Sequence, residues 1–255
     1  MSILSKCVVL SCSYFALLNS QVNASALVEE ATSNYNLSHS QQHYSQEESA
    51  EELELAASNL QTALTTSLLK NILMKNGKTT ISIDISENTL GDEALEVIAA
   101  YPHFQHLYLQ ENCFTDEGAP YLKVFVNAKE VNLSRNYLTS KGLKHLPLNR
   151  LEILQVDSME LGNESLKIIS KAPSLKHLNI RNAQLDDNSA SDLLKMQTVE
   201  ILGLSYNSFT DDSLSIFTQM KNLKALDLSY NKFTQEGIEQ LRIQLPGTMI
   251  LFKTR

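Results

Sequence analysis

Tryptophan is absent from the 255-residue chain, and glycine, proline and cysteine are scarce, at eight, five and three residues. Two of the cysteines, Cys7 and Cys12, lie in an apolar stretch near the N-terminus, which leaves Cys113 alone in the rest of the chain. A single cysteine cannot form an internal disulfide. The rest of the chain must therefore be held together by its core, and a hydrophobic content of 43% is sufficient for a large one.

Positive charge is also in the minority, with 21 lysines and arginines against 29 aspartates and glutamates. The resulting net charge of −8 argues against non-specific binding to nucleic acid or to an anionic membrane surface. We therefore expect no nucleic-acid partner.

The sequence also lacks the short motifs that carry common enzyme chemistry. It contains no nucleophile elbow, no phosphate-binding loop and no paired-cysteine metal motif. We therefore expect no catalytic residues, no cofactor and no metal site.

The N-terminal segment 1–26 has the layout of a secretory signal peptide. Lys6 precedes an apolar stretch over 7–18, and a small-residue sequence follows at 24–26. Cleavage after Ala26 or Ala24 would give a secreted or periplasmic protein. The alternatives are a disordered or membrane-tethered start, and a faint likeness to a bacterial lipoprotein box also lies in the apolar stretch. This stretch is too short for a spanning helix, so no membrane span is expected.

One motif recurs along most of the remaining chain. The stretches "NLSRNYL" at 132–138, "GLSYNSF" at 203–209 and "DLSYNKF" at 227–233 are nearly the same. Alignment on their asparagines gives seven units at a constant spacing, except that the third step, from 136 to 159, is shorter by one. The aligned positions are Asn88, Asn112, Asn136, Met159, Ala183, Asn207 and Asn231.

Each unit predicts a strand, a turn and a short helix. In the last unit Leu226 and Leu228 alternate with small or polar residues over 225–229, which indicates a strand with one buried face. The amphipathic stretch 92–101 of the first unit indicates a helix after the turn.

The aligned asparagines have a predicted structural role. A sharp turn inside a stack of units leaves backbone groups away from water, and an asparagine side chain can both donate to and accept from such groups. The predicted structural ladder is Asn88, Asn112, Asn136, Asn207 and Asn231. Met159 and Ala183 break it, either by sequence drift or because a local change of curvature shapes a site.

The pattern L-x-x-L-x-L-x-x-N-x-L resembles that of the leucine-rich repeat family over residues 79–241. The stretches "TDEGAPYL", "TSKGLKHL" and "TQEGIEQL" are similar to the ribonuclease-inhibitor-like class. The 24-residue period with a small residue at a fixed place is similar to the GALA repeats of bacterial plant-pathogen effectors. No F-box accompanies the repeats, so the ubiquitin-ligase role of those effectors is not expected here.

The resemblance implies an α/β leucine-rich repeat solenoid, a right-handed horseshoe with a concave parallel sheet and short outer helices. It also implies a protein ligand bound on the concave face, and the GALA likeness suggests a secreted bacterial virulence protein that meets a host protein. The alternatives are a non-catalytic periplasmic scaffold and an effector translocated into host cytosol.

The predicted organisation has five parts. After the signal peptide (1–26), residues 27–46 read as a disordered linker. Apolar residues at helical spacing predict an N-terminal capping helix within 47–78, or else a partner-binding or coiled-coil helix. The seven repeats then occupy 79–245, and a C-terminal cap strand occupies 246–255.

The strand register predicts which side chains face outward and are available to a partner. Turn residues such as Glu87, Glu111 and Arg135 are expected to extend this face. The candidate partner-binding residues are Asp84, His106, Tyr108, Gln110, Glu130, Asn132, Gln155, Asp157, His177, Asn179, Arg181, Tyr206, Asp227 and Tyr230. The two histidines belong to the second and fifth repeats, about 14 Å apart at the usual strand spacing, which is too far for joint catalysis or metal binding.

Overall fold

The computed structural model describes residues 65–78 and 80–254. The predicted signal peptide, linker and first part of the capping helix lie outside the described residues. The described chain forms one eight-stranded sheet whose strands follow one another in chain order, every neighbouring pair being parallel. The strands are β1 (Ser82–Asp84), β2 (His106–Tyr108), β3 (Glu130–Asn132), β4 (Ile153–Gln155), β5 (His177–Asn179), β6 (Ile201–Gly203), β7 (Ala225–Asp227) and β8 (Met249–Leu251).

The inward face of this sheet forms the core, as the alternation of the sequence predicts. The central residue of every strand points inward and is buried; for example, Leu226 is fully buried and is aligned with Leu202 and Ile250 of the neighbouring strands. The leucines of successive repeats join one hydrophobic cluster that extends from Leu69 to Ile250. The fold is therefore an α/β leucine-rich repeat solenoid.

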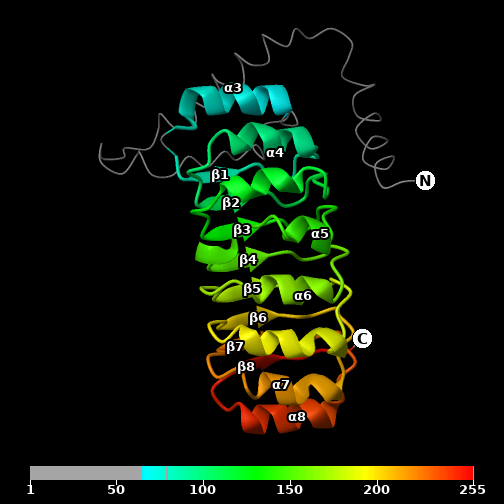
Figure 1. The fold of residues 1–255 in the computed structure, drawn as a ribbon. Coiled ribbons are helices and arrows are strands. Elements are labelled where there is room, and N and C mark those ends of the chain that lie inside the picture. The colour runs from blue at the N-terminus through cyan, green and yellow to red at the C-terminus, as the bar shows by residue number, and fades with distance from the viewer. Residues whose placement is uncertain (1–64, 79, 255) are drawn as a thin grey trace, which may run out of the picture.

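Short helices return the chain from the end of one strand to the start of the next. Figure 1 shows them stacked alongside the ladder of strands. The α-helices are α4 (Asp92–Ala99), α5 (Ser140–Leu143), α6 (Glu164–Ile169), α7 (Leu214–Phe217) and α8 (Gln235–Gln244), and the 3₁₀ segments are η2 (Ala119–Val124), η3 (Leu148–Arg150), η4 (Asp187–Lys195) and η5 (Asp211–Ser213).

The 3₁₀ segments differ from the regular helices that the sequence leads one to expect. In the second repeat Pro120 lies in the first turn of η2, where it has no N–H to donate. Each short repeat must also cover the core with few residues, and a 3₁₀ segment spans more length per residue than an α-helix.

The strands are shorter than the stretch 225–229 leads one to expect. Regular pairing covers Ala225–Asp227, and the chain then makes individual hydrogen bonds, such as the one from the Leu228 N–H to the Leu251 carbonyl at 2.9 Å. In three repeats the next outward position is buried, at Ser134, Ser205 and Ser229.

Helix α3 (Thr66–Asn76) covers the first repeat. Thr65 is extended, and its hydroxyl accepts a hydrogen bond from the Leu68 N–H at 3.2 Å, so a helix begins here. This helix lies within the range 47–78 in which the sequence predicts a capping helix, and the earlier part of that range lies outside the described residues. Leu69 and Leu73 are fully buried on the face of α3 that packs against the first repeat.

At the other end, the predicted closing strand is β8. It pairs parallel with β7, and Met249 is aligned with Ala225 just as Ala225 is aligned with Ile201 of β6. The strand therefore continues the array as part of an eighth, shorter unit.

Four ladder asparagines, Asn112, Asn136, Asn207 and Asn231, connect neighbouring turns, and Asn88 of the first repeat donates to the Ile85 carbonyl of its own turn. Asn136 is representative: its Oδ1 accepts from the Phe114 N–H at 3.1 Å, and its Nδ2 donates to the carbonyls of Leu109 and Leu133, each at 2.9 Å. Leu109 and Phe114 belong to the preceding repeat, so one side chain satisfies backbone groups of two units.

At the broken positions of the ladder, apolar side chains fill the space. Met159 and Ala183 are buried, and the Ala183 N–H donates to the Oδ1 of Asn207 at 3.0 Å. The Asn207 side chain of the next repeat thus compensates for part of the missing contact.

The residue immediately before each ladder position has a left-handed backbone. Its φ is between 49° and 60° in all seven repeats although none of these residues is glycine. In this conformation the N–H reaches the next repeat; for example, the Ser158 N–H donates to the Arg181 carbonyl at 2.8 Å. We call these the turn residues: Glu87, Glu111, Arg135, Ser158, Asn182, Tyr206 and Tyr230.

A second ladder lies at the start of the helical segments, where the sequence patterns "TDEG", "TSKG" and "TQEG" occur. Asp116 accepts hydrogen bonds from both the N–H and the hydroxyl of Thr139 in the next repeat. Similar pairs recur between other repeats, and they are Asp92–Thr115, Asp187–Thr210 and Asp211–Thr234. The small residue of each pattern has a steric reason, since a Cβ on Gly142 would lie 2.6 Å from Oδ1 of Asp116.

Candidate binding face

The outward positions of β1–β7, the next outward position after each of these strands and the turn residues form one continuous surface, which we call the sheet face. Most of its side chains are half-buried, because each lies between its counterparts on the neighbouring strands. The predicted partner-binding residues all lie on this surface, at the register positions that the strand pairing assigns.

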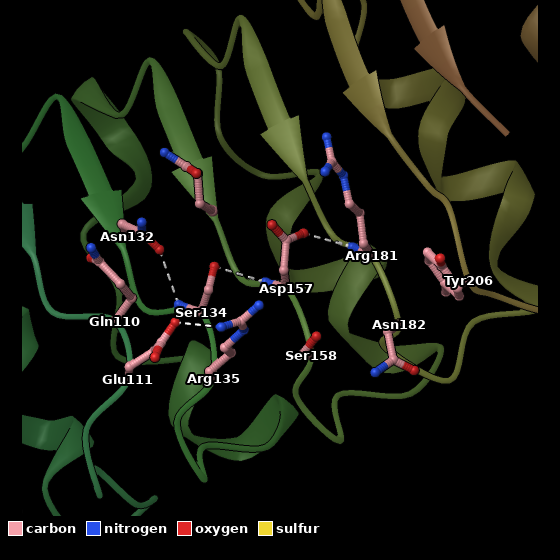
Figure 2. A pocket seen from close by; sticks show the side chains of 11 residues that line it. Gln110, Glu111, Asn132, Ser134, Arg135, Asp157, Ser158, Arg181, Asn182 and Tyr206 are labelled. Carbon is pink, nitrogen blue, oxygen red and sulfur yellow. Dashed lines mark hydrogen bonds and ion pairs between the residues drawn. The ribbon is translucent and has the colours of Figure 1, made fainter. Parts of the chain in front are cut away.

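A hollow of about 500 Å³ lies over the middle of the sheet face, beside the ends of β2–β6 (Figure 2). Six of the predicted residues line it: Gln110, Asn132, Gln155, Asp157, Arg181 and Tyr206. Its other lining residues are Glu111, Ser134, Arg135, Ser158 and Asn182. The prediction missed Ser158 and Asn182, although their place before Met159 and Ala183 in the repeat alignment marks them as turn residues.

The floor of the hollow is a series of bonds from backbone N–H groups to side-chain oxygens. The Ser134 N–H donates to Oδ1 of Asn132 at 3.1 Å, and the Asp157 N–H donates to Oγ of Ser134 at 3.0 Å. The Arg181 N–H then donates to Oδ1 of Asp157 at 2.8 Å (Figure 2). These bonds fix Ser134 and Asp157 across three neighbouring repeats.

Asp157 has an unusual electrostatic environment. Burial raises the pKa of its carboxyl above the ordinary 3.8, and the Arg181 N–H together with the charges of Arg181 and Arg135 only partly opposes this rise. The side chain is thus a carboxylate whose charge is incompletely compensated, at the centre of the hollow.

The two arginines of the hollow differ in their contacts. Arg135 forms an ion pair with Glu111 of the preceding repeat. The Arg181 side chain is exposed and passes over Gly203, where a Cβ would lie 3.1 Å from Nε of Arg181. Figure 2 shows its guanidinium extended away from the carboxylate of Asp157.

Three predicted residues meet next to the hollow, on β2 and β3. Glu130 accepts a hydrogen bond from the Tyr108 hydroxyl at 2.9 Å, and the Nδ1 of His106 lies 3.2 Å from the same carboxylate oxygen. Neither Tyr108 nor His106 lines the hollow. The three side chains form a polar cluster around the half-buried Glu130 carboxylate.

Two tyrosines stack on the opposite side. The rings of Tyr206 and Tyr230 lie 4.3 Å apart with an interplanar angle of 21°. Tyr206 is half exposed and reaches the edge of the hollow. Tyrosine and arginine are enriched at binding hot spots, so Arg181 and this pair give the face a composition suited to a protein interface.

The remaining predicted residues lie on the sheet face away from the hollow. The Oδ1 of Asp84 accepts from both the N–H and the hydroxyl of Ser86, and Asp227 accepts from the Ser229 N–H. His177 and Asn179 lie on β5, three strands from His106 in the sheet order. Within 65–78 and 80–254, no group of three or more potential metal ligands is placed to hold an ion.

The edge of the sheet at the other ends of the strands has a different pattern, which the sequence reasoning did not identify. Lys176 pairs with Glu152, and Lys224 pairs with Glu200, each at 2.6 Å. These residues precede β4–β7, so acidic and basic side chains alternate along the edge. The pairing lowers the pKa of both glutamates and raises that of Lys176.

Comparisons with known proteins agree with this architecture. A family model described as "Leucine Rich repeat" matches residues 102–122 and 219–241. An internalin from Listeria monocytogenes has a similar fold, with a TM-score of 0.56 and 20% identity over 70% of this chain and 49% of the internalin. This chain thus spans about half the length of that internalin. No protein with a curated description matches the sequence significantly.

None of the helices in the described part of the chain is long and apolar enough to cross a membrane. The ribonuclease-inhibitor-like or GALA-like subtype stays a prediction, because the two similarities do not distinguish between repeat classes. The stacked parallel strands, the asparagine contacts between turns and the two matching repeats lead to one conclusion: the chain folds as a leucine-rich repeat solenoid.

Proposed function

We propose that the protein is a non-catalytic interaction protein that binds a protein partner on its sheet face. The hollow between Gln110 and Tyr206 is the observation that carries this proposal. It lies on a rigid sheet, it is lined by polar and charged side chains, and an exposed arginine and a tyrosine pair lie beside it. Repeat solenoids present extended surfaces of this kind to their partners.

The size of the face supports a protein ligand that also contacts the turns. The six spacings between β1 and β7 and a depth of about five residues give roughly 29 Å by 16 Å, about 460 Å². A standard interface covers about 800 Å² on each partner. The turn residues, which adjoin the strands along one edge, supply the additional area.

The experiment is capture of a partner by the immobilised protein. Tyr108→Ala and Arg181→Ala are expected to reduce capture at least tenfold each, because both remove large side chains from the sheet face. The matched controls are Tyr121→Ala and Lys123→Ala on η2, outside the sheet face, which should leave capture unchanged. Equal capture by all four variants would place the interface elsewhere.

We further propose that the protein is secreted by a bacterium and acts on a host protein as a virulence factor. The signal-like segment 1–26 and the resemblance to GALA repeats support this proposal. Mass spectrometry of the mature protein tests the export step, with an N-terminus expected at Leu27 or Ser25. An intact Met1 would instead support delivery into host cytosol, and a mature protein retained in the periplasm without a host ligand would support the scaffold alternative.

A further inference from the structure

The sheet face carries an excess of negative charge. Counting all positions of the sheet face gives six acidic and two basic side chains, a net charge of −4. The acidic residues are Asp84, Glu87, Glu111, Glu130, Asp157 and Asp227, and the basic ones are Arg135 and Arg181. Such a surface attracts a basic partner and repels an acidic one.

Three of these carboxylates have side-chain partners, among them Asp84, which accepts from the Ser86 hydroxyl. Glu130 has the Tyr108 hydroxyl and His106, and Glu111 has Arg135. Asp157, like Asp227, accepts only a backbone N–H at one oxygen, and its other oxygen accepts no hydrogen bond among the described residues. It is also the carboxylate that lies in the middle of the hollow (Figure 2).

The neighbouring arginines do not compensate the charge of the Asp157 carboxylate. Arg135 is occupied by Glu111, and the guanidinium of Arg181 extends away from Asp157 (Figure 2). The raised pKa of Asp157 has the same meaning: the cost of burying its charge outweighs the attraction of both arginines. An additional cation in the hollow would compensate the carboxylate.

One acceptor that lines the hollow has no donor among the described residues. The side-chain oxygen of Gln110 is buried there and accepts no hydrogen bond from the described residues. A lysine carries three N–H donors and an arginine five, with no acceptor. The volume of about 500 Å³ falls in the range of about 300–1,000 Å³ that accommodates ligands, although the polar lining favours a charged side chain over an apolar ligand.

We infer that the hollow is the receptor for a lysine or arginine side chain of the partner, which pairs with Asp157 while further basic residues of the partner face the acidic positions around it. This inference rests on the proposed function, because it assumes that the sheet face is the interface. It assigns a chemistry to the partner: a basic segment, with one cation seated in the hollow.

The test uses two labelled eight-residue peptides, one of alternating serine and arginine and one of alternating serine and glutamate. Fluorescence anisotropy at physiological ionic strength measures their binding to the full chain. The arginine peptide is expected to bind and the glutamate peptide not. Asp157→Asn should weaken binding of the arginine peptide about tenfold, whereas Asp212→Asn, an equal charge change at an exposed site off the sheet face, should weaken it less than twofold.

A second readout shows whether the cation reaches the hollow. In an NMR titration with the arginine peptide, the side-chain carboxyl resonance of Asp157 should shift, while that of Asp212 should not. Thermal unfolding of both variants verifies that they fold. Equal weakening in both variants, or preferred binding of the glutamate peptide, would overturn the inference.

The two proposals fail in different ways. A partner that is captured through Tyr108 and Arg181 but binds Asp157→Asn as tightly as the unaltered protein overturns the inference and leaves the sheet-face function intact. If substitutions on the sheet face leave capture of the partner unchanged, both proposals are overturned.

Discussion

The carboxylate of Asp116 accepts two hydrogen bonds from Thr139 of the next repeat, from the N–H at 2.8 Å and from the hydroxyl at 2.6 Å. A third comes from the Gly142 N–H at 2.9 Å. One side chain therefore joins a turn of the second repeat to the first turn of α5. We predict that Asp116→Ala lowers the free energy of unfolding by about 2–3 kcal/mol, since hydrogen bonds to a charged group are lost and two N–H groups lose their acceptor.

Urea denaturation at neutral pH measures this loss. The matched control is Asp212→Ala, an exposed carboxylate in the corresponding region of the sixth repeat, with an expected change within about 0.5 kcal/mol. A loss for Asp116→Ala that is no larger than that of the control would contradict the role assigned to the second ladder.

The small residue beside this carboxylate gives the next prediction. Gly142→Ala should destabilise the protein by about 1–3 kcal/mol, because the new Cβ would lie 2.6 Å from Oδ1 of Asp116 and 2.9 Å from Leu138. Gly247→Ala has no atom within 4 Å of the new Cβ and should be nearly neutral. Comparison of the two melting temperatures checks the steric explanation.

Removal of a ladder asparagine is predicted to have a larger effect. Asn136→Ala leaves the Phe114 N–H and the carbonyls of Leu109 and Leu133 without this partner inside the stack. The expected loss is about 2–4 kcal/mol by urea denaturation, the range for several unsatisfied buried groups. A loss below about 1 kcal/mol would show that water reaches these groups.

The left-handed turn residues can be tested at Ser158, which is exposed and has a φ of 56°. A β-branched residue adopts this backbone poorly, so Ser158→Val should lower stability by about 1–2 kcal/mol. Glycine adopts it without strain, so Ser158→Gly should leave stability unchanged or raise it slightly. The reverse order of the two variants in thermal unfolding would be inconsistent with the assigned backbone.

The ion pairs at the sheet edge predict a pH dependence. The pairing with Lys176 holds the pKa of Glu152 below its ordinary 4.5, so this pair contributes stability above pH 4.5 that is lost as the pH falls through the lowered pKa. Lys176→Met should reduce the acid-dependent loss of stability between pH 6 and 3, and Lys171→Met, an exposed lysine elsewhere, should not. The contribution should also shrink at high salt, because exposed ion pairs are screened.

The contribution of Asp157 to stability should change with pH in the opposite direction. Burial raises the pKa of its carboxyl, so its contribution is most favourable below the ordinary 3.8 and is lost as the pH rises through the raised pKa. Asp157→Asn is therefore expected to leave stability at pH 7 unchanged or higher. A marked destabilisation at pH 7 would mean that its bond to the Arg181 N–H outweighs the cost of burial.

Much of the fold could be predicted from the sequence because the same pattern of apolar and polar residues recurs in each repeat. Leu226 and Leu228 alone are compatible with many strands, but their recurrence at a constant spacing fixes both the parallel order and the register of the sheet. The residue at which a helix begins was harder to predict. The helix start at Thr65 depends on one side-chain hydrogen bond within a stretch whose apolar spacing continues through it.

Part of the candidate site could also be predicted from the sequence, because the repeats fix the alignment of its residues. The strand register predicts that Asp157 and Arg181 lie on one face. It does not predict how deeply each side chain is buried, so the sequence indicated neither the hollow nor the burial of Ser134. The alternating charges of Glu152 and Lys176 were overlooked because they precede the strands, where the repeat motif has no fixed residue type.

The seven turn residues share a backbone but not a chemistry: two glutamates, an arginine, a serine, an asparagine and two tyrosines adopt one conformation. The geometry of each turn is thus independent of what its side chain offers to solvent. Substitutions can change the side chains of the turn residues one repeat at a time while the backbone beneath them stays the same. A family of variants with exchanged turn residues would accordingly serve as a library of recognition specificities on a single architecture.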